Sequence, residues 1–215
     1  MKACSRRWPA WNGGQSGIRT NGRKPKSPRG QRVRFRVALA GTLRLDVLSI
    51  VIAERTEGNM ANKTYGTVSP ERQKAMSGLE FVNGLVSGAL PLNTIAQTLG
   101  YDVVEVESGR VAITLDPTGA HLNPWGTVHG GLAATLLDSC MGLAIQSMLE
   151  KGVGSTTLEF KISLVRAITL ETGQIRAEGR VLNCGRRVDM AEGRVTDAKS
   201  RLLAHGATTC LIFPS

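Results

Sequence analysis

The chain is organised around residues 123–144, which read Asn123-Pro-Trp-Gly-Thr-Val-His-Gly-Gly-Leu-Ala-Ala-Thr-Leu-Leu-Asp-Ser-Cys-Met-Gly-Leu-Ala144. The first half is rich in turn-forming Pro and Gly, and the second half is largely apolar. This pattern predicts a loop followed by a helix that is buried on nearly all sides. Asp138 is the single acid in that helix. Because an unpaired buried carboxylate is costly, Asp138 either has a partner or takes part in chemistry.

The start of this helix suits a group that develops negative charge. Gly130 and Gly131 stand in the first turn, where backbone N–H groups lack intrahelical partners and glycine lets a substrate approach. Asp138 follows Gly131 by seven residues, so it lies on the same face but about 10 Å further along the axis. One carbonyl group cannot contact both ends in a single chain. We therefore expect an antiparallel second copy of the helix to bring Asp138 beside the partner's Gly130.

The pattern formed by Asn123, Gly126, His129-Gly130-Gly131 and Asp138 resembles the signature of the PaaI-type acyl-CoA thioesterases of the hotdog superfamily. The resemblance covers roughly residues 90–213 and includes three further segments, Thr157–Ser163, Gly179–Arg187 and Leu203–Ala207. It implies an α+β hotdog fold, in which a curved antiparallel β-sheet wraps around one long central helix. It also implies hydrolysis of an acyl- or aryl-CoA thioester to the free acid and CoA, with no cofactor.

Hydrophobic periodicity predicts elements that agree with this fold. Ser69-Pro70-Glu71 predicts the start of a helix that runs to about Val86, and a shorter helix is expected over 92–99. A hairpin is expected over 101–107 and 110–116, followed by the central helix over about 130–150. Strands are expected over 155–166, 173–183, 187–197 and 201–213. We expect these four strands to form a meander in a sheet curved around the helix.

The net positive charge of the chain comes entirely from its first segment. Residues 1–59 contain 13 Lys and Arg and three Asp and Glu, which accounts for the net charge of +10 of the whole chain. We interpret 1–59 as a disordered basic extension upstream of a true start at Met60, 60–89 as an N-terminal helix, and 90–215 as the hotdog thioesterase domain. Without a basic surplus in the globular part, a nucleic-acid partner is not expected.

The apolar stretch over 36–53 is interrupted by Arg44 and Asp46, so a membrane span is not expected, although a transit peptide remains open. The four cysteines form no CxxC pair, and the three histidines show no metal-ligand spacing. We expect reduced cysteines, no metal site and a cytoplasmic protein.

The resemblance assigns roles to the residues of the central segment. Asp138 serves as general base for water or as nucleophile on the thioester carbonyl. Gly130 is the favoured N–H donor to that carbonyl, with Gly131 beside it in the substrate site. His129 belongs to the same site, where we expect it to orient the turn rather than transfer a proton. Asn123 either positions the attacking water or holds the loop.

Further site residues follow from the downstream matches. Thr157, or Thr156 if the alignment shifts by one position, is expected to hold water or substrate, although an ordinary strand threonine is a competing interpretation. Arg166, Arg186 and Arg187 are candidates for contact with the phosphates of CoA, or are solvated turn residues. We expect a homodimer, or a homotetramer built from two dimers. The alternatives are a non-catalytic acyl-CoA-binding hotdog module and a hotdog hydratase or dehydratase.

Overall fold

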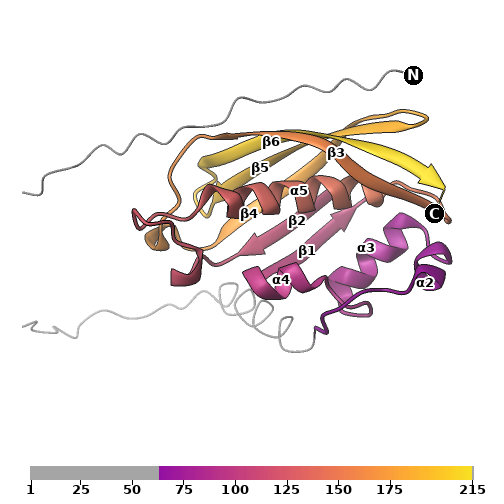
Figure 1. Ribbon diagram of the computed structural model, residues 1–215, viewed down its shortest axis with the longest axis horizontal. Coiled ribbons are helices and arrows are strands. Elements are labelled where there is room, and N and C mark those ends of the chain that lie inside the picture. Colours follow the sequence, from indigo (N-terminus) through magenta and orange to yellow (C-terminus); the bar gives the residue numbers. More distant parts are fainter. Residues whose placement is uncertain (1–62, 215) are drawn as a thin grey trace, which may run out of the picture. The chain divides into compact units, whose positions relative to one another are not determined.

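The computed structural model describes residues 63–214, so the basic extension and the proposed start at Met60 lie outside the described residues. Four α-helices, two short 3₁₀ helices and six strands follow one another along this part of the chain (Figure 1). The α-helices are α2 (Pro70–Lys74), α3 (Gly78–Ser87), α4 (Thr94–Leu99) and α5 (Gly130–Gln146). The 3₁₀ helices are η1 (Gly119–His121) and η2 (Leu170–Thr172). The strands are β1 (Tyr101–Glu107), β2 (Arg110–Leu115), β3 (Val153–Leu164), β4 (Ile175–Cys184), β5 (Val188–Asp197) and β6 (Leu202–Pro214).

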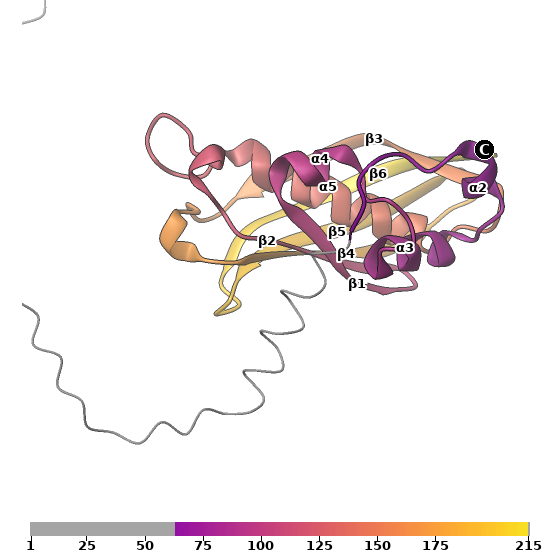
Figure 2. The same cartoon turned by 90° about the horizontal axis from the view of Figure 1, so that it is seen from below.

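The six strands form one antiparallel sheet in the order β1-β2-β4-β5-β6-β3. Helix α5 lies across one face of this sheet (Figures 1 and 2), and the predicted α+β hotdog architecture is confirmed. The predicted four-strand meander was wrong at β3, which pairs with β6 instead of β4. Periodicity reveals that a strand exists but not which strand is its neighbour, and α5 delivers the chain to the edge opposite β1.

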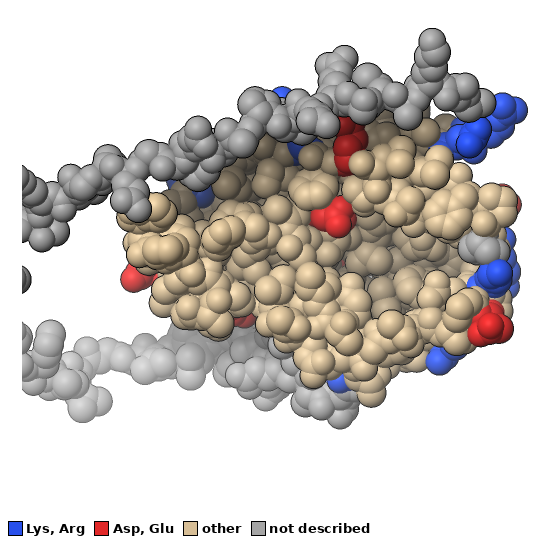
Figure 3. All heavy atoms as spheres, in the orientation of Figure 1, with Lys and Arg blue, Asp and Glu red and all other residues tan. Residues whose placement is uncertain are grey.

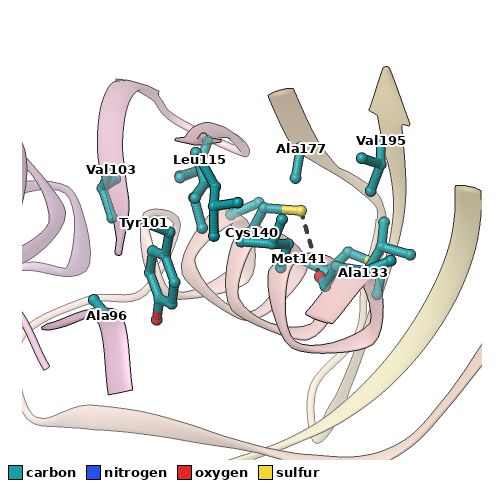
Figure 4. Packing of buried hydrophobic residues seen from close by; sticks show 14 of the residues in the cluster. Ala96, Tyr101, Val103, Leu115, Ala133, Cys140, Met141, Ala177 and Val195 are labelled. Carbon is teal, nitrogen blue, oxygen red and sulfur yellow. Dashed lines mark hydrogen bonds between the residues drawn. The ribbon is translucent and has the colours of Figure 1, made fainter. Parts of the chain in front are cut away.

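Helix α5 is buried because large and small apolar side chains alternate around it. Leu136, Leu137 and Met141 are completely buried against the sheet, and Figure 4 shows Met141 among side chains of several strands. The helix ends at Gln146, four residues earlier than expected. The reason is Ser147, whose Oγ donates to the carbonyl of Ala144 (2.7 Å) and accepts the N–H of Gly109 (2.8 Å) in the β1–β2 turn.

The sheet touches the backbone of α5 at one glycine. A Cβ atom added to Gly179 of β4 would lie 2.3 Å from the carbonyl oxygen of Cys140 and 2.7 Å from the nitrogen of Met141. These are backbone atoms, which cannot move aside without moving the helix. Gly179 therefore sets how closely α5 approaches the sheet.

The segment before the sheet contains three helices where two were predicted, because the first predicted helix is divided into α2 and α3. α2 ends at Lys74, and Ser77 then begins α3 through a capping box in which its N–H donates to the Glu80 carboxylate (2.7 Å). Gly88 and Gly100 end α3 and α4 in the left-handed conformation, with φ of 77° and 73°. These two stops were correctly expected from the sequence.

The N-terminal helices pack into the same core as the sheet. Val82 and Leu85 of α3 belong to the hydrophobic cluster that includes α5. Lys63 forms a buried ion pair with Asp102 of β1 and also donates to the carbonyl of Val103 (3.2 Å). Among residues 63–214, no helix is long and apolar enough to cross a membrane.

Candidate active site

Asp138 projects from α5 toward β3. The hydroxyl of Thr157 donates a 3.0 Å hydrogen bond to its Oδ1 atom, and the Asp138 side chain is only half-buried. The pairing of β3 with β6 shifts register directly after Thr157, between Thr157 and Glu159. Of the two candidate threonines, Thr157 thus contacts the acid, whereas Thr156 is exposed. A carboxyl group with one hydrogen-bond donor is positioned here, where such a group can accept a proton or attack a carbonyl.

A cavity of about 420 Å³ opens beside Asp138. It follows one side of α5 from Asp138 to Gln146, which is about 12 Å along the helix axis. The opposite walls come from the start of β3, the end of β6 and the N-terminal helical segment. The lining consists of Gln73, Phe81, Asn93, Asp138, Ser139, Gly142, Leu143, Gln146, Val153–Thr157, Cys210 and Phe213. This volume lies within the usual range of small-molecule sites.

The N-terminus of α5 offers one free backbone donor. The N–H of Gly131 donates to Nδ1 of His129 (2.9 Å), so that histidine serves as the N-cap of the helix. No acceptor is recorded for the N–H of Gly130 within residues 63–214. Gly130 is thus available to a ligand, while Gly131 is already bonded. The ring nitrogen of His129 that faces the helix accepts a hydrogen bond, which agrees with the expected orienting role.

The loop before α5 is held by Asn123. Its Nδ2 donates to the hydroxyl of Thr127 (2.8 Å), and its Oδ1 accepts the N–H groups of Trp125 (2.9 Å) and Thr127 (3.3 Å). Both ends of the amide are therefore engaged within the loop. Of the two roles expected for Asn123, this geometry favours holding the loop.

A second cavity, of about 240 Å³, lies at this end of α5. Its lining includes Asn123, His129, Gly130, Leu164 and Arg166, and it shares no residue with the cavity at Asp138. Seven of the candidate residues thus fall into two groups within one chain, and Gly131, Arg186 and Arg187 line neither cavity. Asp138, Thr156 and Thr157 line the larger cavity, whereas Asn123, His129, Gly130 and Arg166 line the smaller one.

The three candidate arginines do not gather at one place. Arg166 lies in the smaller cavity, where its Nη1 donates to the carbonyl of Leu202 (3.2 Å). Arg186 and Arg187 are exposed in the β4–β5 turn and belong to neither cavity lining. Within the described residues, neither arginine side chain forms a hydrogen bond or ion pair with another candidate residue.

Sequence reasoning missed a polar chain behind the larger cavity. The Tyr101 hydroxyl lies 3.0 Å from Oδ1 of Asn93 and 3.3 Å from Oγ of Ser139. Figure 4 shows the hydroxyl of Tyr101 directed away from the apolar cluster that surrounds its ring. Ser139 follows Asp138 directly, but nothing in a single sequence signals that Asn93, 46 positions earlier, reaches the same place.

The nearby thiols are not suited to act as nucleophiles. Burial raises the pKa of both Cys140 and Cys210, so the reactive thiolate form is disfavoured. Within residues 63–214, no three His, Cys, Asp or Glu side chains cluster in a way that would hold a metal ion. Asp138 is therefore the group in this region that is best placed for chemistry.

Comparison with known proteins identifies relatives of the chain. A family model described as the thioesterase superfamily matches residues 126–204. The 1,4-dihydroxy-2-naphthoyl-CoA hydrolase of Listeria monocytogenes serotype 1/2a (strain 10403S) is 21% identical over 118 residues, which cover 55% of this chain and 94% of the relative.

Two solved structures extend the comparison. The phenylacetic acid degradation-related protein of Ralstonia eutropha JMP134 is 28% identical with a TM-score of 0.56, and the match covers 61% of this chain and 98% of that one. A conserved protein of Pseudomonas aeruginosa is 33% identical with a TM-score of 0.52, and the match covers 55% of this chain and 93% of that one.

Proposed function

The chain belongs to the thioesterase superfamily and is a thioester hydrolase, and from this premise we propose that it cleaves an acyl- or aryl-CoA thioester to the free acid and CoA. The observation that carries the proposal is the half-buried Asp138, bonded by Thr157, at the end of a cavity of about 420 Å³. The free N–H of Gly130 supplies a hydrogen-bond donor for the thioester oxygen. A relative whose name states that it hydrolyses a CoA thioester supports the choice of CoA.

Each group then has a defined task. The N–H of Gly130 donates to the thioester oxygen and stabilises the negative charge that develops there during attack. Asp138 takes a proton from water, whose oxygen bonds to the carbonyl carbon. The C–S bond breaks, CoA leaves as a thiolate, and the thiolate takes up the proton that Asp138 removed from water. In the alternative route, Asp138 attacks directly and water hydrolyses the resulting anhydride. Both routes use the same two groups, and neither requires a strong general acid.

The two groups meet across a dimer in this proposal. They line different cavities of one chain, and an antiparallel partner helix would place the partner's Gly130 beside Asp138. β3 supports such a partner, because it is an edge strand whose Leu158, Phe160 and Leu164 are 56%, 43% and 58% exposed. Figure 3 shows that the face carrying α5 is largely uncharged, with Lys and Arg mainly near its rim. A homotetramer would pair two such dimers.

Roles for the remaining candidates follow from this arrangement. Thr157 orients the carboxylate, with Thr156 beside it at the rim, while Asn123 and His129 hold the loop and turn that present Gly130. Arg166 is close enough to the smaller cavity to contact a phosphate of CoA, and Arg186 and Arg187 would do so only from another subunit. A hydratase would need a histidine working with an acid, but Nδ1 of His129 accepts the N–H of Gly131 and so caps the helix.

The test is thiol release from a panel of acyl- and aryl-CoA substrates by the purified protein. Asp138→Asn should abolish turnover while thermal unfolding and CoA binding are retained. Asp116→Asn is the matched control, because Asp116 is exposed and lines neither cavity. Turnover by the Asp138→Asn variant at the original rate would leave the protein without its proposed catalytic acid. CoA binding without thiol release from any substrate would instead identify a binding module.

A further inference from the structure

Behind the larger cavity, the hydrogen bonds that link Asn93, Tyr101 and Ser139 have a fixed direction of donation. The Oδ1 atom of Asn93 accepts the backbone N–H of Ala96 (3.2 Å), which identifies it as the oxygen of the amide. Because that oxygen only accepts, the hydrogen of the Tyr101 hydroxyl points to Asn93 (3.0 Å). The Tyr101 oxygen must then accept from Ser139, 3.3 Å away. The single hydrogen of Ser139 is consequently engaged inside the wall of the cavity.

This direction determines what the wall offers to a ligand. Ser139 and Asn93 both line the larger cavity. Toward the cavity Ser139 presents only lone pairs, whereas the amide nitrogen of Asn93 presents only hydrogens. Tyr101 is 1% exposed, so it lies behind these two groups and holds them without meeting the ligand. The wall therefore pairs an acceptor with a donor, both attached to the same buried hydroxyl.

We propose that Ser139 and Asn93 determine specificity for a hydroxyl group on a compact acyl part of the thioester. A hydroxyl is a compact neutral group that both donates, here to Ser139, and accepts, here from Asn93, through one atom. Ser139 adjoins Asp138 on α5, whereas Gln146 at the far end lies two turns further on. The recognised hydroxyl must thus lie only a few bonds from the reacting carbonyl. This inference rests on the proposed function, because it places the carbonyl at Asp138.

The pairing also predicts which substrates are disfavoured. An acyl group without a substituent leaves the acceptor and the donor unpaired when it covers them, and sites built for a hydroxyl discriminate strongly against such analogues. A methoxy group accepts but cannot donate, so it leaves Ser139 unpaired. The order of preference is hydroxyl over unsubstituted and methoxy.

The experiment measures kcat/KM by thiol release for benzoyl-CoA, its three hydroxy regioisomers and the matching methoxybenzoyl-CoA compounds. The wild-type protein should prefer one hydroxybenzoyl-CoA over benzoyl-CoA by about tenfold or more. Ser139→Ala should bring this ratio close to one by lowering the value for the hydroxylated substrate. Thr135→Ala is the matched control, because it also removes a hydroxyl from α5. That hydroxyl donates to the Gly131 carbonyl (3.0 Å), and Thr135 does not line the cavity.

A second variant tests the direction of the hydrogen bonds that link Asn93, Tyr101 and Ser139. Tyr101→Phe frees the hydrogen of Ser139 to turn into the cavity, so the methoxy compound should gain on the hydroxy compound by several-fold. Thermal unfolding checks that the buried ring still packs in each variant. Equal kcat/KM for benzoyl-CoA and every hydroxybenzoyl-CoA, or a preference that survives Ser139→Ala, would overturn the inference and leave the thioesterase assignment standing. Failure to cleave any thioester would overturn both.

Discussion

The hydroxyl of Thr157 on β3 donates a 3.0 Å hydrogen bond to Oδ1 of Asp138 on α5, which joins the edge strand of the sheet to the acid of the central helix. Within the described residues, no donor is recorded for the other carboxylate oxygen of Asp138. One oxygen is thus held by the protein, and the other is available to a water molecule or a carbonyl carbon. The hydrogen bond also fixes the rotation of the carboxylate about its side chain.

Removing this hydrogen bond should slow turnover without abolishing it. Thr157→Val keeps the shape of the side chain but deletes the donor, and a hydrogen bond to a charged group is worth enough to predict a loss of about tenfold to hundredfold in kcat. Thr157→Ser restores the donor and should recover most of the rate. Steady-state thiol release measures both variants. Equal rates for the Val variant and the wild type would show that Thr157 is an ordinary strand residue.

The proposed carbonyl donor can be deleted without removing the helix. Gly130 is the first residue of α5, where proline is tolerated, and His129 before it is extended (ψ 132°), as proline requires. Gly130→Pro removes the N–H and should cost about 10²–10³-fold in kcat. Gly130→Ala keeps the N–H while adding a Cβ that meets only the flexible end of Leu164 at 2.6 Å. A comparable loss in both variants would point to crowding instead of a lost donor.

A site shared between subunits predicts complementation. Asp138→Asn and Gly130→Pro chains are each inactive alone, but a mixed dimer contains one site with both native groups. Random mixing after reversible unfolding should therefore restore about a quarter of the wild-type activity, because half of the dimers are mixed and one of their two sites works. Thiol release before and after mixing checks this. Activity that stays at the level of the separate variants would place both groups of each site in one chain.

His129 should affect stability more than chemistry. Its Nδ1 caps α5 through the N–H of Gly131, and loss of such a cap typically costs about 1 kcal/mol of unfolding free energy. His129→Ala should lower the midpoint of denaturant unfolding, whereas His129→Asn, which supplies another capping oxygen, should largely retain it. A fully folded His129→Ala variant with no turnover would instead make His129 the general base.

A charged cluster on β1, β2 and β4 should make stability depend on acid. Hydrogen bonds from Arg176, the largest cause, and from Arg110 hold the pKa of Glu105 below its usual value of 4.5, although burial opposes this. The stabilisation is complete above the unfolded-state pKa and is lost as the pH falls through the lower folded-state value. Glu105→Gln should thus flatten the decline in melting temperature below about pH 4.5. Glu150→Gln, an exposed carboxylate outside the cluster, should leave the profile unchanged.

Local patterns in the sequence predicted those features that depend on neighbouring residues. The hairpin around Gly109, the helix stops at Gly88 and Gly100, and the apolar central helix each follow from a few adjacent positions. The break between α2 and α3 was missed because Met76 and Leu79 continue the apolar period, while the capping box of Ser77 and Glu80 competes with it. The capping box starts a new helix because it provides acceptors for two backbone N–H groups, those of Ser77 and Glu80, at once.

Features that join distant segments were beyond the sequence. The pairing of β3 with β6 depends on which sheet edge the chain reaches after α5, and alternation carries no such information. The contact of Tyr101 with Asn93 and Ser139 requires three separate elements to be placed together. The separation of Asp138 from Gly130 was predictable because both stand on one helix, whose rise per residue is constant.

The contact between Gly179 and the backbone at Cys140 lies only two residues from Asp138. A methyl group at position 179 would push the middle of α5 outward, together with Asp138, which lies two residues from Cys140 on the same helix. The absence of a side chain at Gly179 thus sets the position of α5, and with it the position of Asp138, relative to the sheet. A change at this position would therefore affect all substrates alike, because it displaces Asp138 itself, whereas a change in the cavity lining would affect substrates selectively.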